Sequence, residues 1–136
     1  MSVTPADLAA RGEEFAEFWA EYHLCTLTTL RRDGSPHVVP VGVTLDLGTA
    51  TARVICSGTS AKARHVRAAG PQGARVAVSQ VDRGRWSTLE GLAVVRDDPE
   101  SVADGERRYA GRYRVPRVNP ARVVLEIALT RVLGSR

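Results

Sequence analysis

The chain has 136 residues, of which 43% are hydrophobic and 25% are charged, so it is not a disordered chain and fits one domain. The net charge is +4, and every basic residue except Lys62 is an arginine. Arginine binds carboxylates and phosphates with two hydrogen bonds, although codon bias in a GC-rich genome produces the same excess. Cys25 and Cys56 lie in apolar runs without metal-ligand spacing, so we expect buried, reduced thiols and no metal.

We expect no targeting signal in this sequence. The N-terminal residues include no apolar signal segment, and no run approaches the ~20 apolar residues that cross a bilayer. We therefore expect one domain, 1–136, that is cytoplasmic and has no membrane partner.

The N-terminal segment, 1–22, predicts an amphipathic helix over about 5–22. Thr4 is the expected N-cap, and Asp7 completes a capping-box pattern. Apolar residues recur at helical spacing and give the helix one apolar face: Leu8, Phe15, Phe18, Trp19 and Tyr22.

The rest of the chain, 23–136, is mainly β. Six runs read as strands: 24–30, 36–46, 51–57, 74–81, 86–96 and 121–134. Asp33-Gly34 is a hairpin turn signal, and Gly91 suggests a bulge. Two short helices are expected, over 61–69 and 97–111. Short hairpins imply antiparallel pairing, and six antiparallel strands in so short a chain favour a small barrel.

The loop between the third strand and the first short helix, CSGTSAKAR, is the sharpest candidate site. It combines hydroxyl groups, a glycine that admits a ligand close to the backbone, and a cation at a helix N-terminus: Ser57, Thr59, Ser60, Gly58 and Lys62. This pattern predicts a phosphate cradle, although a serine-capped helix without a ligand has the same sequence.

A second candidate is VSQVDRGRW, residues 78–86. The carboxamide of Gln80, beside Ser79, suits the polar edge of a flat heterocycle, or else the pair faces solvent. Trp86 either stacks on a ring or caps the barrel. His37 has no acid–base partner in the sequence, and no catalytic triad or carboxylate pair emerges. Catalytic residues are therefore unassigned, and an enzyme of this sequence would take its chemistry from a cofactor.

The third candidate, residues 106–122, contains six arginines, with Tyr109 and Tyr113 four residues apart. Basic and aromatic residues together fit a nucleic acid, a polyanionic small molecule or a solvated helix. Because no RNA-binding aromatic motif is present, we expect no nucleic-acid partner.

Together, HLCTLTTLRRDGSPHVVPVGV, the Ser-x-Lys that opens a short helix, VSQVDRGRWSTLEG and RYRVPRVNPARVVLEIALTRVLG resemble the split-barrel flavin and deazaflavin reductases. This superfamily includes the pyridoxamine-phosphate oxidases, and the resemblance is to its actinobacterial F420-dependent branch. It extends from Leu24 to Gly134. It implies a homodimeric split β-barrel with the cofactor in a groove at the dimer interface.

The resemblance also implies roles for individual residues. The cofactor phosphate would be held by Ser57, Gly58, Ser60, Lys62 and Ala63. The deazaflavin would be lined by His37, Val39 and Val41, and faced by Ser79, Gln80 and Trp86. The anionic oligoglutamate tail of the cofactor, or the propionates of a substrate, would be received by Arg114 and Arg117.

The implied reaction is hydride transfer from reduced F420 to a conjugated acceptor, with biliverdin as the first candidate. Two alternatives stay open. The same fold would serve an oxidoreductase that binds FMN, and it would also serve a non-enzymatic protein that binds a flavin or a tetrapyrrole.

Overall fold

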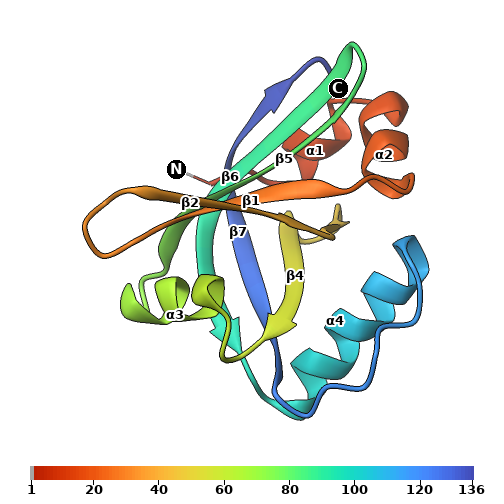
Figure 1. Cartoon of the computed structure of the whole chain (residues 1–136). Helices are drawn as coiled ribbons and strands as arrows, with labels where there is room; N and C mark the ends of the chain where they lie inside the picture. Colours follow the sequence, from red (N-terminus) through yellow and green to blue (C-terminus); the bar gives the residue numbers. More distant parts are fainter. Residues whose placement is uncertain (1) are drawn as a thin grey trace.

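A seven-stranded antiparallel sheet forms the body of the computed structural model, which describes residues 2–136 (Figure 1). The strands are β1 (Cys25–Leu30), β2 (Pro36–Val41), β3 (Thr44–Asp46), β4 (Thr51–Ser57), β5 (Ala74–Asp82), β6 (Arg85–Arg96) and β7 (Arg122–Gly134). Their order is β2-β1-β5-β6-β7-β4-β3. The sheet is strongly twisted, so β1 and β2 cross the long strands β6 and β7 at a steep angle (Figure 1).

The prediction of six strands is wrong because the run 36–46 divides at Gly42 and Val43. The backbone N–H and carbonyl of Val43 form hydrogen bonds with side chains at the end of α4, not with a neighbouring strand. Its N–H donates to Tyr113 Oη at 3.0 Å, and its carbonyl accepts from Arg112 Nη1 at 2.6 Å. A Cβ on Gly42 would lie only 2.7 Å from the Tyr109 ring, so glycine lets that ring pack against the break. These contacts separate β2 from β3.

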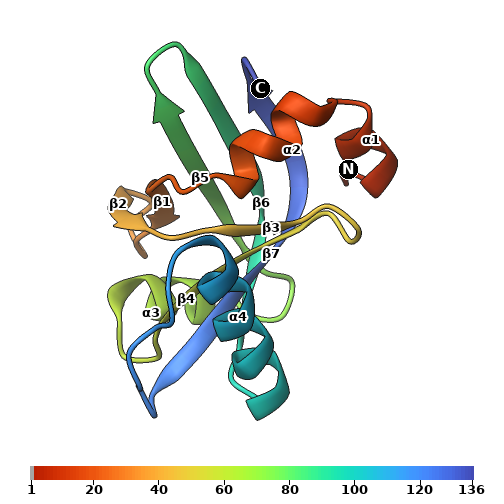
Figure 2. The ribbon, with the colours of Figure 1, turned by 90° about the vertical axis from the view of Figure 1, so that its right-hand side faces the viewer.

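Four helices accompany the sheet: α1 (Pro5–Ala9), α2 (Glu13–Ala20), α3 (Ala61–Ala68) and α4 (Pro99–Arg112). Figure 2 shows α1 and α2 at one end of the sheet, with α3 and α4 toward the other. The helix expected over 97–111 is confirmed as α4, which has 14 residues.

The single N-terminal helix predicted over 5–22 is also wrong. The chain breaks at Gly12, whose φ of +90° is left-handed and ends the helical path. The capping box is confirmed, because Thr4 Oγ1 accepts from Asp7 N and Asp7 Oδ2 accepts from Thr4 N. Tyr22 lies beyond α2 and is 63% exposed, so it does not belong to the buried face.

The core is enclosed by the concave face of the sheet, the N-terminal helices and α3. Alternate residues of β7 are buried on its core face, namely Val123, Leu125, Ile127 and Leu129, and Val124 on the opposite face is buried as well. The bulge is confirmed by a register shift between Glu90 and Gly91. A Cβ on Gly91 would overlap the carbonyl oxygen of Ala128, so the strands approach too closely for any other residue. The two cysteines are buried and free, as expected.

Arg112, in the last turn of α4, is buried and joins three parts of the fold. Its guanidinium donates to Val43 O at 2.6 Å, to Gln80 Oε1 at 2.7 Å and to Glu21 O at 2.8 Å. It also stacks on the Trp19 ring, 5.4 Å from the centroid. A basic residue that the sequence placed among surface arginines therefore holds α4 against α2 and β5.

No helix among residues 2–136 is long and apolar enough to cross a membrane.

Candidate functional site

The β4–α3 loop is shaped by hydrogen bonds within its own backbone and serines. Ser60 is the N-cap of α3. Its hydroxyl donates to Ser57 O at 2.7 Å and accepts from Ala63 N at 3.4 Å. The N–H of Gly58 donates to Ala121 O at 2.7 Å, and a Cβ on Gly58 would lie 3.1 Å from that oxygen. Glycine is therefore needed for the loop to lie against β7. Ala63 is fully buried, so only its backbone faces the loop.

Lys62 is the cation of this loop that is available to bind a ligand. Two nearby arginines brace the loop backbone, because Arg64 donates to Thr59 O at 2.6 Å and Arg67 donates to Gly58 O at 2.8 Å. Lys62 forms no ion pair with a carboxylate among residues 2–136. Its partly exposed ammonium lies in the first turn of α3, where the helix dipole also favours an anion.

Strand β2 presents three of the predicted residues on one face. His37, Val39 and Val41 pair in register with Thr29, Leu27 and Cys25 of β1, all three of which are buried. Because side chains directly opposite each other share a face, His37, Val39 and Val41 lie on the concave side of the sheet. Each of the three is partly buried.

His37 connects this strand to α3. Its ring meets the His65 ring edge to face, with the centroids 5.0 Å apart. His65 Nδ1 is hydrogen-bonded to Thr29 Oγ1 at 2.8 Å. The buried His37 Nδ1 has no hydrogen-bond partner among the described residues. A buried polar atom without a partner is costly, so this nitrogen is available to a polar group of a ligand.

The electrostatics of this corner favour an anion. Burial lowers the pKa of His65, and the positive charges of His37, Arg31 and Arg64 lower that pKa further. Lys62 lies three residues before His65 on the same helix face. The serine loop, the helix N-terminus, Lys62 and the unpartnered His37 nitrogen therefore fit a phosphate group.

The residues predicted from 78–86 divide between the two faces of the sheet. Gln80 is buried on the concave side, where Nε2 donates to Phe18 O at 2.9 Å and Oε1 accepts from Arg112. Ser79, its neighbour, points to the convex side and shares a hydrogen bond of 2.8 Å with Thr88 Oγ1. A role for Gln80 beside a cofactor stays a prediction, while its carboxamide already bridges α2 and α4.

Trp86 lies on the same convex side as Ser79. It is 44% exposed, and its neighbour Ser87 points inward to accept a hydrogen bond from the Trp19 indole at 2.9 Å. Since successive side chains of a strand alternate, Trp86 and Ser79 both point away from the face that carries His37. The fold of this chain therefore does not bring all of the predicted residues to a single surface.

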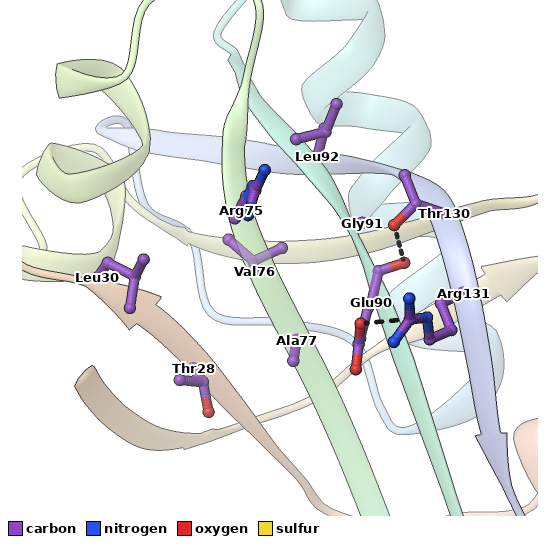
Figure 3. A pocket seen from close by; sticks show the side chains of 10 residues that line it. All are labelled: Thr28, Leu30, Arg75, Val76, Ala77, Glu90, Gly91, Leu92, Thr130 and Arg131. Atoms are coloured by element: carbon purple, nitrogen blue, oxygen red, sulfur yellow. Dashed lines mark hydrogen bonds and ion pairs between the residues drawn. The ribbon is translucent and has the colours of Figure 1, made fainter. Parts of the chain in front are cut away.

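A groove of about 710 Å³ runs along this convex face over β1, β5, β6 and β7 (Figure 3). Thr28 and Ala77 lie on its floor, and Glu90 and Arg131 approach to 4.0 Å at one side. In the sequence, this exposed face is indicated by small or polar residues that alternate with apolar ones along β5 and β6.

Arg114 and Arg117 follow α4 and are exposed. Arg117 borders a groove of about 660 Å³ that also holds two acidic residues, Asp97 and Glu106. Arg107 and Arg122 also line this groove, whereas Arg114 does not, and a role for Arg114 and Arg117 toward an anionic chain stays a prediction. Among residues 2–136, no cluster of three or more His, Cys, Asp or Glu side chains could hold a metal ion.

Comparisons with known proteins agree with this architecture. The family described as pyridoxamine 5'-phosphate oxidase matches residues 12–136. An F420H(2)-dependent biliverdin reductase from Mycobacterium tuberculosis is 53% identical over 118 residues, which are 87% of this chain and 83% of that protein.

Two solved structures share the fold at 23% identity each. A conserved hypothetical protein from Mycobacterium tuberculosis has a TM-score of 0.73 and covers 89% of this chain and 81% of its own. A protein described as an F420 reductase has a TM-score of 0.70, with coverage of 90% and 98%.

Proposed function

Because this chain belongs to the pyridoxamine 5'-phosphate oxidase family, we propose that it is an F420-dependent oxidoreductase that reduces a conjugated acceptor of the biliverdin class. The observation that carries the proposal is the 53% identity to an F420H(2)-dependent biliverdin reductase. The cationic β4–α3 loop and the unpartnered His37 nitrogen, whose ring contacts His65 of α3, support a phosphate-bearing cofactor.

When bound, F420 supplies the hydride. The residues that would hold its phosphate are Lys62, the hydroxyl of Ser57 and the N-terminal turn of α3, where Ser60 shapes the loop as the N-cap. The imidazole of His37, whose Nδ1 has no partner among the described residues, would offer a further polar group from β2. Val39 and Val41 would cover one side of the ring system and exclude water from it. We assign the accompanying proton to solvent, because no carboxylate is among the residues of this site.

The chemical contribution of the chain is position and electrostatics. Holding two flat rings face to face removes the entropic cost of bringing them together in the reacting step. Cations near the acceptor stabilise the negative charge that develops during reduction. A site of this kind needs no nucleophile, which is consistent with a sequence that contains no catalytic triad.

We further propose that the enzyme is a homodimer. Ser79 and Trp86 lie on the convex face, whereas His37 and Lys62 lie at the concave side and its loop. These residues contact one cofactor only if the convex face of a second copy covers the site. The groove along the convex face offers small side chains and the Glu90–Arg131 pair for such an approach. The free thiols fit the proposed cytoplasmic location.

The cofactor is tested by titrating purified apo-protein with F420 and, in parallel, with FMN, while following fluorescence. Dissociation constants in the micromolar range or below for F420, with weaker FMN binding, support the proposal. A preference for FMN assigns the protein to the flavin enzymes. Tight binding of F420 or of a tetrapyrrole without turnover of biliverdin makes it a carrier.

The Lys62→Ala variant tests the phosphate site. Loss of one charge-assisted hydrogen bond, worth about 1.5–3 kcal/mol, should raise the Kd of F420 about tenfold to a hundredfold. Turnover at saturating cofactor should change much less. The matched control is Arg107→Ala, which removes a charge that is 71% exposed on α4. An unchanged Kd in Lys62→Ala would exclude the proposed role.

The dimer is tested by placing a charge in the convex groove with Ala77→Arg. Sedimentation should show a dimeric wild type and a monomeric variant, and the variant should lose F420 binding while keeping its circular dichroism spectrum. A monomeric wild type that binds F420 with micromolar affinity would contradict the shared site.

A further inference from the structure

Two histidines meet beside the proposed phosphate site, one from β2 and one from α3. The rings of His37 and His65 make an edge-to-face contact with their centroids 5.0 Å apart, where α3 packs against the β1–β2 hairpin (Figure 1). The buried Nδ1 of His37 has no hydrogen-bond partner within residues 2–136. Lys62 lies one helical turn before His65, a rise of about 4.5 Å along α3. The contact therefore connects β2 to the helix that carries the cation of the phosphate site.

A hydroxyl group holds His65 in either of its protonation states. Nδ1 of His65 is 2.8 Å from Thr29 Oγ1, and Thr29 is almost fully buried on β1, directly opposite His37 in the strand register. A threonine hydroxyl both donates and accepts, so it can donate to an unprotonated Nδ1 and accept from a protonated one. Thr29 therefore fixes the position of His65 without fixing its charge.

The charged side chains around this pair of rings are cationic. They are Arg31 and Arg32 of the β1–β2 turn, Lys62 and Arg64 of α3, and Arg75 at the start of β5. No aspartate or glutamate lines the depression that contains His65, and Asp33 of the same turn accepts its hydrogen bonds from Ser35. Burial and the neighbouring positive charges lower the pKa of His65, so this ring is neutral at pH 7 when no anion is bound.

An anion bound at Lys62 reverses this balance. Its negative charge favours the protonated form of a nearby imidazole, by the same electrostatic rule that disfavours that form among cations. Two imidazolium groups 5.0 Å apart repel each other, so the two rings titrate as a pair that holds one proton near neutral pH. Binding of the anion and binding of that proton therefore strengthen each other.

We propose that the His37–His65 pair takes up a proton when the cofactor phosphate binds, with His65 as a positioning residue that acts through His37. The inference rests on the proposed function, because the phosphate is that of the proposed cofactor. His37 offers its unpartnered nitrogen to the phosphate, and His65 sets the pH at which the pair becomes charged. The site then binds a phosphate more tightly as the pH falls toward 6.

The test measures anion binding by NMR of the histidines, of which the chain has three. The probe is sulfate at constant ionic strength, because its double charge does not change near neutral pH. In the wild type, the Kd of sulfate should fall about five- to tenfold from pH 8 to pH 6, the change that uptake of most of one proton produces. The variant His65→Asn keeps a hydrogen-bond partner for Thr29 but does not titrate, so its Kd should change less than about twofold.

The matched control is His23→Asn, which removes an imidazole outside the pair and should behave as the wild type does. In saturating sulfate, the titration midpoint of one histidine of the pair should rise by about one pH unit, which a purely structural role of His65 would not produce. Circular dichroism checks the fold, and His65→Gln replaces His65→Asn if the latter does not fold. The same pH dependence of sulfate binding in the variant and the wild type would overturn the proposal, as would the absence of sulfate binding.

The cofactor itself is then compared at two pH values. The Kd of F420 in His65→Asn should be close to that of the wild type at pH 8 and about fivefold higher at pH 6. Taking the ratio of variant to wild type at each pH cancels any titration of the ligand. A ratio that is the same at both pH values would contradict the coupling. If F420 does not bind the wild type at either pH, the proposed function fails, and the sulfate measurement still decides on the histidine pair.

Discussion

The substitution Arg112→Met tests whether the hydrogen bonds of Arg112 hold α4 against the rest of the fold. Methionine has a similar length and keeps the apolar contacts, but it donates no hydrogen bond. The three short bonds from Arg112 go to Val43 O, Gln80 Oε1 and Glu21 O, at 2.6–2.8 Å. Hydrogen bonds from a charged donor contribute about 1.5–3 kcal/mol each.

A simple sum of these three bonds overestimates the loss. Val43 O keeps the hydroxyl of Tyr113 at 3.2 Å, and Gln80 Oε1 keeps the thiol of Cys25 at 3.4 Å. Methionine also removes the cost of burying a charge. We therefore expect a loss of about 3–4 kcal/mol in the free energy of unfolding, a large part of the ~5–15 kcal/mol typical of a domain. The melting temperature should fall by about 10–15 °C.

The assay is equilibrium unfolding in urea, followed by circular dichroism, with Arg107→Met as the control. Arg107 lies on the same helix, 71% exposed, with an ion pair to Asp104 that contributes at most about 1 kcal/mol. If Arg112→Met and Arg107→Met differ by less than about 1 kcal/mol, the burial of Arg112 does not hold α4 in place, and the reasoning is refuted.

Two further predictions concern a glycine and a histidine. Gly91→Ala should destabilise the fold by about 3 kcal/mol, because its Cβ overlaps Ala128 O. Gly111→Ala, with nothing within 4 Å, should be neutral or stabilising by up to about 1 kcal/mol; equal urea midpoints would contradict this contrast. The pKa of His65 is lowered below 6.5 in the fold, so the unfolded chain binds the proton more readily. Stability in the absence of ligand should therefore be complete above pH 6.5 and decline as the pH falls below it. If the free energy of unfolding of a His65→Gln variant depended on pH as that of the wild type does, His65 would not be the cause of the decline.

Local patterns in the sequence predicted much of this protein. Runs of β-forming residues located most of the strands, Asp33-Gly34 located a hairpin, and Thr4 with Asp7 located a helix start. These features depend on interactions between residues a few positions apart, so they are visible in the chain itself. The β4–α3 loop was found for the same reason, since a serine cap, a glycine and a lysine are adjacent in sequence.

Other features depended on contacts between distant residues. The break after β2 arises because the side chains of Arg112 and Tyr113, some 70 positions later, form hydrogen bonds with the backbone of Val43. Strand alternation separated Ser79 from Gln80, but only packing against α2 and α4 decided which of them is buried. Arg31, Arg64 and Arg75 are far apart in the sequence, yet they line one depression where the β1–β2 hairpin, α3 and the start of β5 meet. The sequence shows which residues carry a charge. Whether such a residue is buried or paired with an opposite charge depends on neighbours that only the tertiary fold brings together.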